Sequence, residues 1–231
     1  MIIALRRLCT WAAILSLASL AAVATAQTTP ITPLDKQLSR IDLGVAAIGV
    51  ITKDTTGPQV TTPSTPITDN PSGTVGALVT LRYIKSPLVG LEFNYSYARF
   101  AQDYTYDQQT PGTPLPGTST LLEIQANATE YTFGWVFHTP KVFGIGTFAS
   151  AGAGTTAFRP SKNGGDNVTE QARATYYYNV GVEQSILSPK FGFRASFRQA
   201  FYLAPDFQQT YLRNGQRTIT TEPSVGFYLH F

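Results

Sequence analysis

Most of the chain alternates between apolar and polar residues with a period of two, the pattern of strands whose two faces meet different environments. Residues 89–98 show it most clearly, with Val89, Leu91, Phe93, Tyr95 and Tyr97 on one face and Gly90, Glu92, Asn94, Ser96 and Ala98 on the other. The same pattern predicts strands over residues 41–51, 75–85, 121–137, 143–158, 172–184, 191–201 and 218–231, eight in all. Each is about ten residues or longer, the length that a tilted strand needs to cross a bilayer.

One strand changes its parity. Leu122, Ile124 and Ala126 alternate out of phase with Tyr131 and Phe133 in the segment 121–137. Because a shift of one residue turns every side chain to the other face, we expect either a bulge near residues 127–129 or a strand that begins later.

The connections between the strands alternate in length. Short turns at residues 86–88, 138–141 and 185–190 each contain a proline. Long polar connections cover residues 52–74, 101–120, 159–171 and 202–217. We call the two sides the short-turn end and the long-loop end. This organisation predicts an all-β fold, an eight-stranded antiparallel up-and-down transmembrane β-barrel over residues 41–231.

The polar face of the strands is poor in charge. Only 13% of the residues are charged, whereas soluble domains average about a quarter. The polar faces carry mostly small residues and a sparse mixed set of charges: Arg82, Glu92, Glu130, Arg173, Glu183, Arg194, Arg198 and Glu222. We interpret these as a network that pairs across a narrow polar lumen. The alternative is a secreted β-sandwich, a binding module whose polar faces would meet water and would be expected to carry many Lys and Glu.

Aromatic residues gather toward the strand ends on the apolar face, where a membrane interface accepts both a ring and its polar tip. The predicted interface aromatics are Tyr83, Tyr97, Tyr131, Trp135, Phe137, Phe143, Tyr176 and Phe191.

The first 26 residues have the organisation of a cleaved secretory signal peptide, with Arg6 and Arg7 before an apolar stretch and Ala24-Thr25-Ala26 as the cleavage site. An anchoring helix is the alternative. We expect residues 27–40 to form a short periplasmic leader. Cleavage reduces the 17 basic residues to 15 against 14 acidic ones, which leaves no basic stripe for a nucleic acid. The only cysteine is Cys9, so the exported chain has no disulfide.

The last strand ends the chain on an aromatic residue, with Phe227, Leu229 and Phe231 at alternate positions. This ending resembles the C-terminal signature of bacterial outer-membrane barrels. With the predicted signal and eight strands, the exported chain is similar to the small barrels of the class that contains outer-membrane proteins A, W and X. The resemblance implies location in the cell outer membrane, contact with its lipids and lipopolysaccharide, and assembly by the barrel assembly machinery, which would read the last strand.

Catalytic chemistry has little support in the sequence. Gly144 and Gly146 lie in a strand rather than in a turn before a helix, so we predict no dinucleotide site. His138 and His230 are the only histidines and both lie at the short-turn end, so we expect no metal, no cofactor and no enzyme. The main hypothesis is a structural barrel whose long loops bind a surface partner. The rival is a narrow passive pore or a transport route for a small ligand.

Overall fold

The structure is a computed structural model that describes residues 32–58, 66–108, 117–142, 144–162 and 168–231. The predicted signal peptide, residues 27–31 of the predicted leader and Phe143 lie outside the described residues. Within the leader, residues Pro33–Leu38 form the short helix α2, whose first turn is capped where the Asp35 amide donates to Thr32 Oγ1 at 3.2 Å. In the described part of the chain, no helix has both the length and the apolar character needed to span a membrane.

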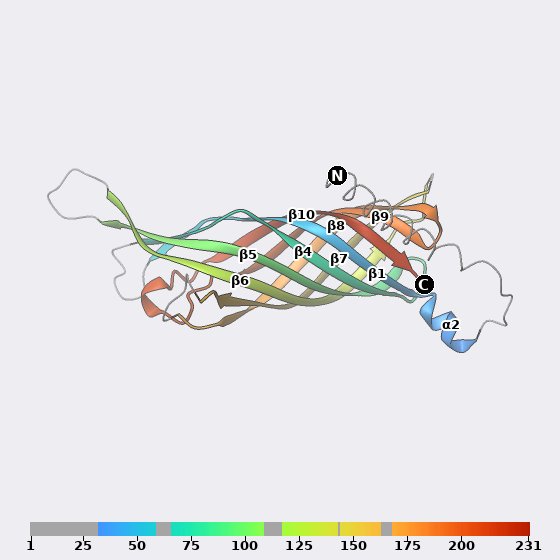
Figure 1. The fold of residues 1–231 in the computed structure, drawn as a ribbon, viewed down its shortest axis with the longest axis horizontal. Coiled ribbons are helices and arrows are strands. Elements are labelled where there is room, and N and C mark those ends of the chain that lie inside the picture. The colour runs from blue at the N-terminus through green and yellow to red at the C-terminus, as the bar shows by residue number, and fades with distance from the viewer. Residues whose placement is uncertain (1–31, 59–65, 109–116, 143, 163–167) are drawn as a thin grey trace, which may run out of the picture. The chain divides into compact units, whose positions relative to one another are not determined.

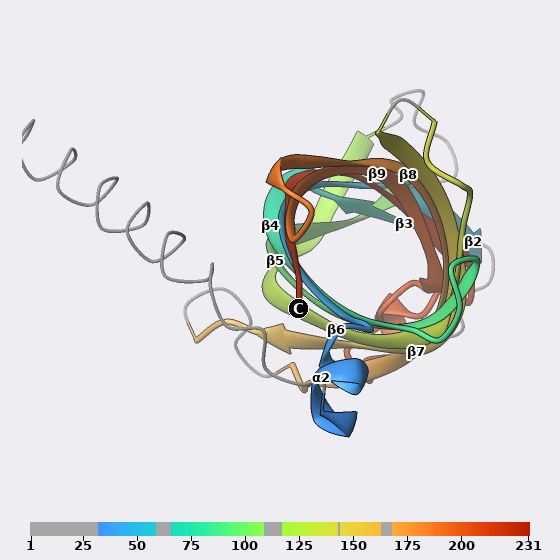
Figure 2. The ribbon, with the colours of Figure 1, turned by 90° about the vertical axis from the view of Figure 1, so that its right-hand side faces the viewer.

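Eight strands form a closed antiparallel barrel, as predicted (Figures 1 and 2). They are β1 (Ile41–Thr52), β4 (Thr74–Ile84), β5 (Val89–Gln108), β6 (Gly117–His138), β7 (Ile145–Pro160), β8 (Gln171–Ser188), β9 (Phe191–Leu203) and β10 (Arg217–His230). Neighbours along the chain pair with one another, and β10 returns to pair with β1. A single sheet that closes on itself excludes the sandwich.

Two long connections contain more strand than predicted. The segment 101–120 is largely a continuation of β5 and β6, which protrude as a hairpin beyond the ends of β4 and β7 (Figure 1). The segment 52–74 contains β2 (Thr55–Pro58) and β3 (Pro66–Pro71), and β3 pairs with the protruding part of β5. The long-loop end therefore carries a small sheet of its own, made of β2, β3 and the β5–β6 hairpin.

The predicted bulge near residues 127–129 is wrong. The β6–β7 register runs without a shift from Ala126 to His138, and the β5–β6 register shifts only between Tyr104 and Thr105. Ile124 and Ala126 keep the inward parity of Glu130 and are fully buried. No change of face is needed, because the barrel interior becomes apolar toward the long-loop end.

The seam between the first and last barrel strands is interrupted. The β1–β10 register passes from Ile48 opposite Ser224 directly to Ile51 opposite Thr221. Pro223 lies in this gap and has no N–H to donate to the ladder. A Cβ on Gly49 would lie 3.3 Å from Pro223 Cγ, so the glycine lets the proline ring approach the neighbouring strand.

Candidate functional site

The barrel interior holds a buried charged layer. Seven of the eight charges predicted for the lumen are at most 9% exposed: Arg82, Glu92, Glu130, Glu183, Arg194, Arg198 and Glu222. Strand parity directs all seven inward, because they alternate with exposed apolar residues on the same strands. Burial of this many ionised groups requires that each finds a partner.

Most of the ion pairs join neighbouring strands rather than crossing the barrel. Arg82 lies opposite Glu92 in the β4–β5 ladder, and its Nη2 is 2.6 Å from Glu92 Oε2. Arg194 lies opposite Glu183, with Nη2 at 3.1 Å from Oε2. The register of the sheet thus places each guanidinium next to a carboxylate. The expectation that pairing runs across the lumen is only partly correct.

Two arginines also reach across the interior. Arg82 Nη1 lies 3.5 Å from Glu183 Oε2, which joins β4 to β8. Arg198 on β9 contacts Glu222 on the adjacent strand and Glu130 on β6, three strands away around the barrel. These contacts link strands that do not pair with one another, so the charged layer extends across the lumen.

Aromatic rings fill the space that inward-facing glycines leave open. A Cβ on Gly192 would come within 2.4 Å of the Tyr228 ring, and a Cβ on Gly181 within 2.7 Å of Phe148. Arg82 Cζ lies 4.1 Å from the centroid of the Phe148 ring, a cation–π contact. These two glycines therefore make room for aromatic side chains.

The eighth predicted charge, Arg173, belongs elsewhere. It lies at the long-loop end and pairs with Asp206, at 2.9 Å between Nη2 and Oδ2, and not with the charged layer. Asp206 belongs to the connection between β9 and β10, residues 204–216, which we call the cap. Burial alone would raise the pKa of Asp206, but its hydrogen bond from Gln171 and the charge of Arg173 lower it on balance. Parity placed Arg173 inside, but parity does not reveal the partner.

The cap is tied to several elements of the barrel. Gln171 Oε1 accepts hydrogen bonds from the backbone amides of Asp206 (2.8 Å) and Phe207 (3.1 Å). Tyr104 on β5 donates its hydroxyl to the carbonyl of Pro205 at 2.6 Å. Asn214 Nδ2 donates to Thr55 Oγ1 on β2 at 3.0 Å. The cap therefore has a defined conformation, which a sequence rich in turn residues did not indicate.

Phe207 closes the apolar part of the interior. Phe207 and Leu212 are buried in a cluster with apolar residues of the barrel, listed here: Ile48, Val50, Leu78, Phe100, Ile124, Phe158 and Tyr202. Phe207 and Gln208 have φ angles of 47° and 62°, a left-handed conformation that is uncommon for residues other than glycine. Such strain persists where surrounding contacts over-determine it, as the Gln171 hydrogen bonds do here.

At the long-loop end, the carboxyl of Asp69 on β3 is buried. It is 1% exposed, and its Oδ1 has no hydrogen-bond partner among the residues that the structure describes. Burial, reinforced by the negative charges of Asp54 and Asp103, raises its pKa to about 8. Asp69 therefore retains its proton at neutral pH.

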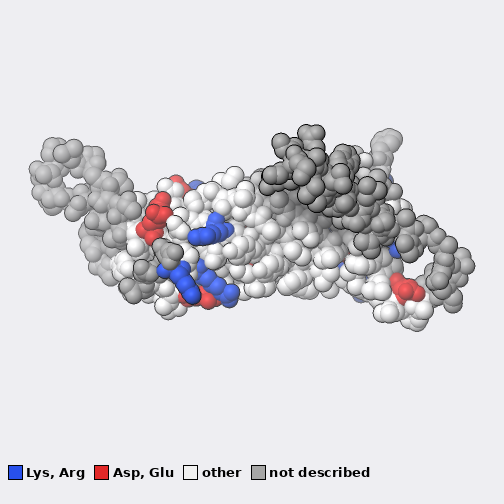
Figure 3. Space-filling view, viewed as in Figure 1, with Lys and Arg blue, Asp and Glu red and all other residues white. Residues whose placement is uncertain are grey.

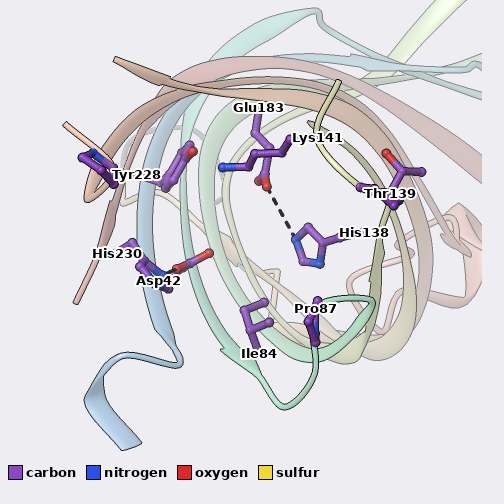
Figure 4. Close-up of a pocket in the computed structure, with 11 residues that line it drawn as sticks. Asp42, Ile84, Pro87, His138, Thr139, Lys141, Glu183, Tyr228 and His230 are labelled. Atoms are coloured by element: carbon purple, nitrogen blue, oxygen red, sulfur yellow. Dashed lines mark hydrogen bonds and ion pairs between the residues drawn. The ribbon is translucent and has the colours of Figure 1, made fainter. Parts of the chain in front are cut away.

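The short-turn end opens into a hollow of about 440 Å³ (Figure 4). His138 points into it, with Nε2 at 3.9 Å from Glu183 Oε1, and His230 contacts Asp42. Asp42 was missed in the sequence, although its parity on β1 is that of the lumen. Within the described residues, no three His, Cys, Asp or Glu side chains are placed to hold a metal ion. Deeper in the barrel, two further cavities hold about 20 Å³ each, which is roughly the room for one water.

The outer face of the barrel is apolar. The predicted interface aromatics that the structure describes all point outward, and Tyr97, Tyr131, Trp135, Phe137 and Tyr176 are 40–59% exposed. Phe227, Leu229 and Phe231 are likewise outward and 41–55% exposed. On the side shown in Figure 3, most of the visible charged side chains lie at the long-loop end, a few lie at the short-turn end, and the visible surface between them is nearly uncharged. A large exposed apolar band is what a lipid-facing wall presents.

Comparison with solved structures identifies the fold. The outer membrane protein OprG from Pseudomonas aeruginosa aligns with a TM-score of 0.55 and 13% identity over 83% of this chain and 95% of its own. The Neisserial surface protein A aligns with a TM-score of 0.50 and 10% identity over 82% of this chain and 97% of its own. No family model matches the chain, and no curated protein matches its sequence. The fold is that of the small eight-stranded outer-membrane barrels.

Proposed function

We propose that the protein is a non-enzymatic barrel of the outer membrane that is closed to ions and that presents a structured surface for a partner outside the cell. The surface consists of the β2–β3 strands, the β5–β6 hairpin and the cap. The observation that carries this proposal is the filled interior. The charged layer and the apolar cluster under Phe207 occupy the lumen in series. The fold of OprG and of the Neisserial surface protein A supports the location in the outer membrane.

Closure of the lumen predicts the absence of channel activity. The protein inserted into a planar lipid bilayer should give no discrete conductance steps. Removing the charge that bridges the lumen, in Arg198→Gly, should give small steps, because the guanidinium is 1% exposed and spans from Glu222 to Glu130. A matched control, Arg159→Gly, removes an arginine from the outer surface and should remain silent. Reproducible steps from the unaltered protein would refute the proposal.

The orientation can be tested by chemical labelling of whole cells. Since the only cysteine lies in the predicted signal peptide, a single new cysteine reports on its own position. We expect Gln208→Cys in the cap to react with a membrane-impermeant maleimide in intact cells. Lys190→Cys, in a short turn, should react only after the outer membrane is permeabilised. The reverse result would place the long loops in the periplasm and end the proposal of a surface partner.

Passage of a small apolar molecule is the second candidate. It is favoured by the apolar cluster inside the barrel and by the interrupted β1–β10 seam at Pro223. The cluster is closed by Phe207, so this function requires that the cap opens. The segment just before β8 contacts the cap, where Thr169 donates to the carbonyl of Phe207 and Gln208 donates to that of Glu170. A cysteine pair that locks the two together, Gln208→Cys with Thr169→Cys, should then abolish uptake of the molecule and leave growth on polar nutrients unchanged. Unchanged uptake in the locked protein would exclude the apolar route through the cap.

A further inference from the structure

Basic residues mark the edge of the apolar wall at the long-loop end. Lys53, Arg99, Arg159 and Arg217 are exposed and continue the outward parity of β1, β5, β7 and β10. Between these positions and the short-turn end, the outward positions of the eight barrel strands carry no Asp, Glu, Lys or Arg in the part that the structure describes. On four strands, the first charged residue that follows the apolar outer surface toward the long-loop end is therefore basic.

Two of these residues lie in one row of the sheet. Arg99 is the register partner of Asn127, and Asn127 is the register partner of Arg159. The two arginines are therefore two strands apart, about 10 Å between backbones, with an amide between them. Asn127 Oδ1 accepts the Tyr97 hydroxyl at 3.1 Å, and Gln125 Oε1 accepts from Arg99 Nη2 at 3.1 Å. The row combines two guanidiniums with an amide on the outer surface.

An apolar and aromatic surface lies directly below this row. Tyr97 is one outward position nearer the short-turn end than Arg99, and Tyr95 and Tyr131 pack at 5.3 Å between ring centroids one position further. Outward residues from Val89 to Tyr97 span roughly 20 Å along the axis of a barrel with strands tilted by about 40°, close to the ~25 Å apolar band of such barrels. The row therefore lies at the depth of the lipid headgroups.

We propose that Arg99, Asn127 and Arg159 bind the phosphate of a phosphorylated lipid in the outer leaflet, with its acyl chains along Tyr95, Tyr97 and Tyr131. Guanidiniums match phosphate oxygens in number and geometry, and the tyrosine rings accept the junction between sugar and chain. The inference rests on the membrane location of the barrel and is independent of the surface partner.

A neighbouring carboxylate competes for one of the two cations. Arg159 Nε lies 2.8 Å from Glu170 Oε1, and both side chains are about half exposed. An exposed pair of this kind is weak and exchangeable. The lipid phosphate replaces Glu170 as the partner of Arg159, so neutralising Glu170 should strengthen lipid binding.

Native mass spectrometry of the folded barrel in detergent tests the site, with bis-phosphorylated lipid A as the probe. The double variant Arg99→Gln/Arg159→Gln should bind lipid A at least about tenfold more weakly, since two charge-assisted contacts are lost. Glu170→Gln should bind it several-fold more tightly. The matched control Lys85→Gln/Lys190→Gln removes two positive charges at the short-turn end and should bind as the unaltered protein does. The heat-dependent gel mobility of each variant establishes that it is folded.

Four results would overturn the proposal. Unchanged binding by Arg99→Gln/Arg159→Gln would exclude the row, and an equal loss in the Lys85/Lys190 control would reduce it to net charge. Equal binding of dephosphorylated lipid A would show that the acyl chains alone are recognised. Displacement of lipid A by inorganic phosphate at millimolar concentration would assign the row to a free anion instead of a lipid.

Discussion

Replacing Arg198 with methionine will lower the free energy of unfolding by about 3–5 kcal/mol. The guanidinium is 1% exposed, contacts both Glu130 and Glu222, and lies 4.6 Å from the centroid of the Tyr177 ring. Methionine fills much of the volume but leaves two carboxylates buried without a cation. The loss comes from these stranded charges and not from the removal of favourable ion pairs as such, because a buried pair roughly offsets its own desolvation.

Urea unfolding in lipid vesicles measures this loss. Outside the predicted signal peptide Trp135 is the only tryptophan, and it is 55% exposed on the outer wall, so its fluorescence reports on transfer from lipid to water. The variant Glu130→Gln/Arg198→Met/Glu222→Gln should recover most of the stability, since no charge is then left unpaired. Arg159→Met on the exposed surface should change stability by less than about 1 kcal/mol. An Arg198→Met protein as stable as the original would show that water or a proton already compensates the carboxylates.

The period of two determined most of what could be predicted. It assigned Glu92, Arg194 and Glu222 to the interior and Tyr97 and Trp135 to the outer wall, and the structure places them so. A two-residue period fixes the face of a side chain, because the pleat alternates strictly. It does not fix which residue lies opposite on the next strand. That depends on register, and for this reason the pairing of Arg194 with Glu183 along the wall was expected across the lumen.

The cap and the apolar half of the interior could not be read in the same way. Ile124 and Ala126 were assigned a bulge because a barrel lumen was assumed to be polar throughout, whereas Phe207 and Leu212 supply an apolar partner from a distant loop. Gln171 and Asp206 are 35 positions apart, and no local pattern connects them. Contacts of this kind depend on the three-dimensional return of a loop, which alternation along a strand does not encode.

Replacing Asp69 with asparagine will make the stability of the small sheet at the long-loop end independent of pH. In the original protein the β2–β3 layer should become less stable by about 1.4 kcal/mol per pH unit between about pH 4 and about pH 8, and remain constant above. The carboxyl has a pKa of about 8 when buried and 3.8 as its unperturbed value. Within this range Asp69 is protonated while the β2–β3 layer is folded (closed) and loses its proton when the layer unfolds locally (opens). Rising pH therefore favours the opened state. Asparagine carries no proton to release, and its layer should keep the same stability throughout.

The surroundings of Asp69 determine the sign. Asp54 and Asp103 add negative charge. The hydroxyl of Tyr104 is close enough to interact electrostatically with Asp69, with the cap residue Asp206 and with its partner Arg173. Among the described residues, the charges that raise the pKa of Asp69 are thus those of acidic side chains. The nearby Arg173 forms its ion pair with Asp206 and not with Asp69. Asp103→Asn should lower the pKa of Asp69 in part, because it removes one repulsive charge and leaves the burial unchanged. The slope should then stay at about 1.4 kcal/mol per pH unit but end at a lower pH than in the original protein.

Amide hydrogen exchange of β3, corrected for intrinsic base catalysis, measures the opening free energy at each pH. Ile67 is the natural reporter, because it is 1% exposed and pairs with β2 on one side and β5 on the other. A slope in the original protein that disappears in Asp69→Asn assigns the effect to this carboxyl. An identical slope in both proteins would assign it to another group, and a layer that becomes more stable as pH rises would mean that Asp69 is ionised in the closed state, held by a cation or water at Oδ1.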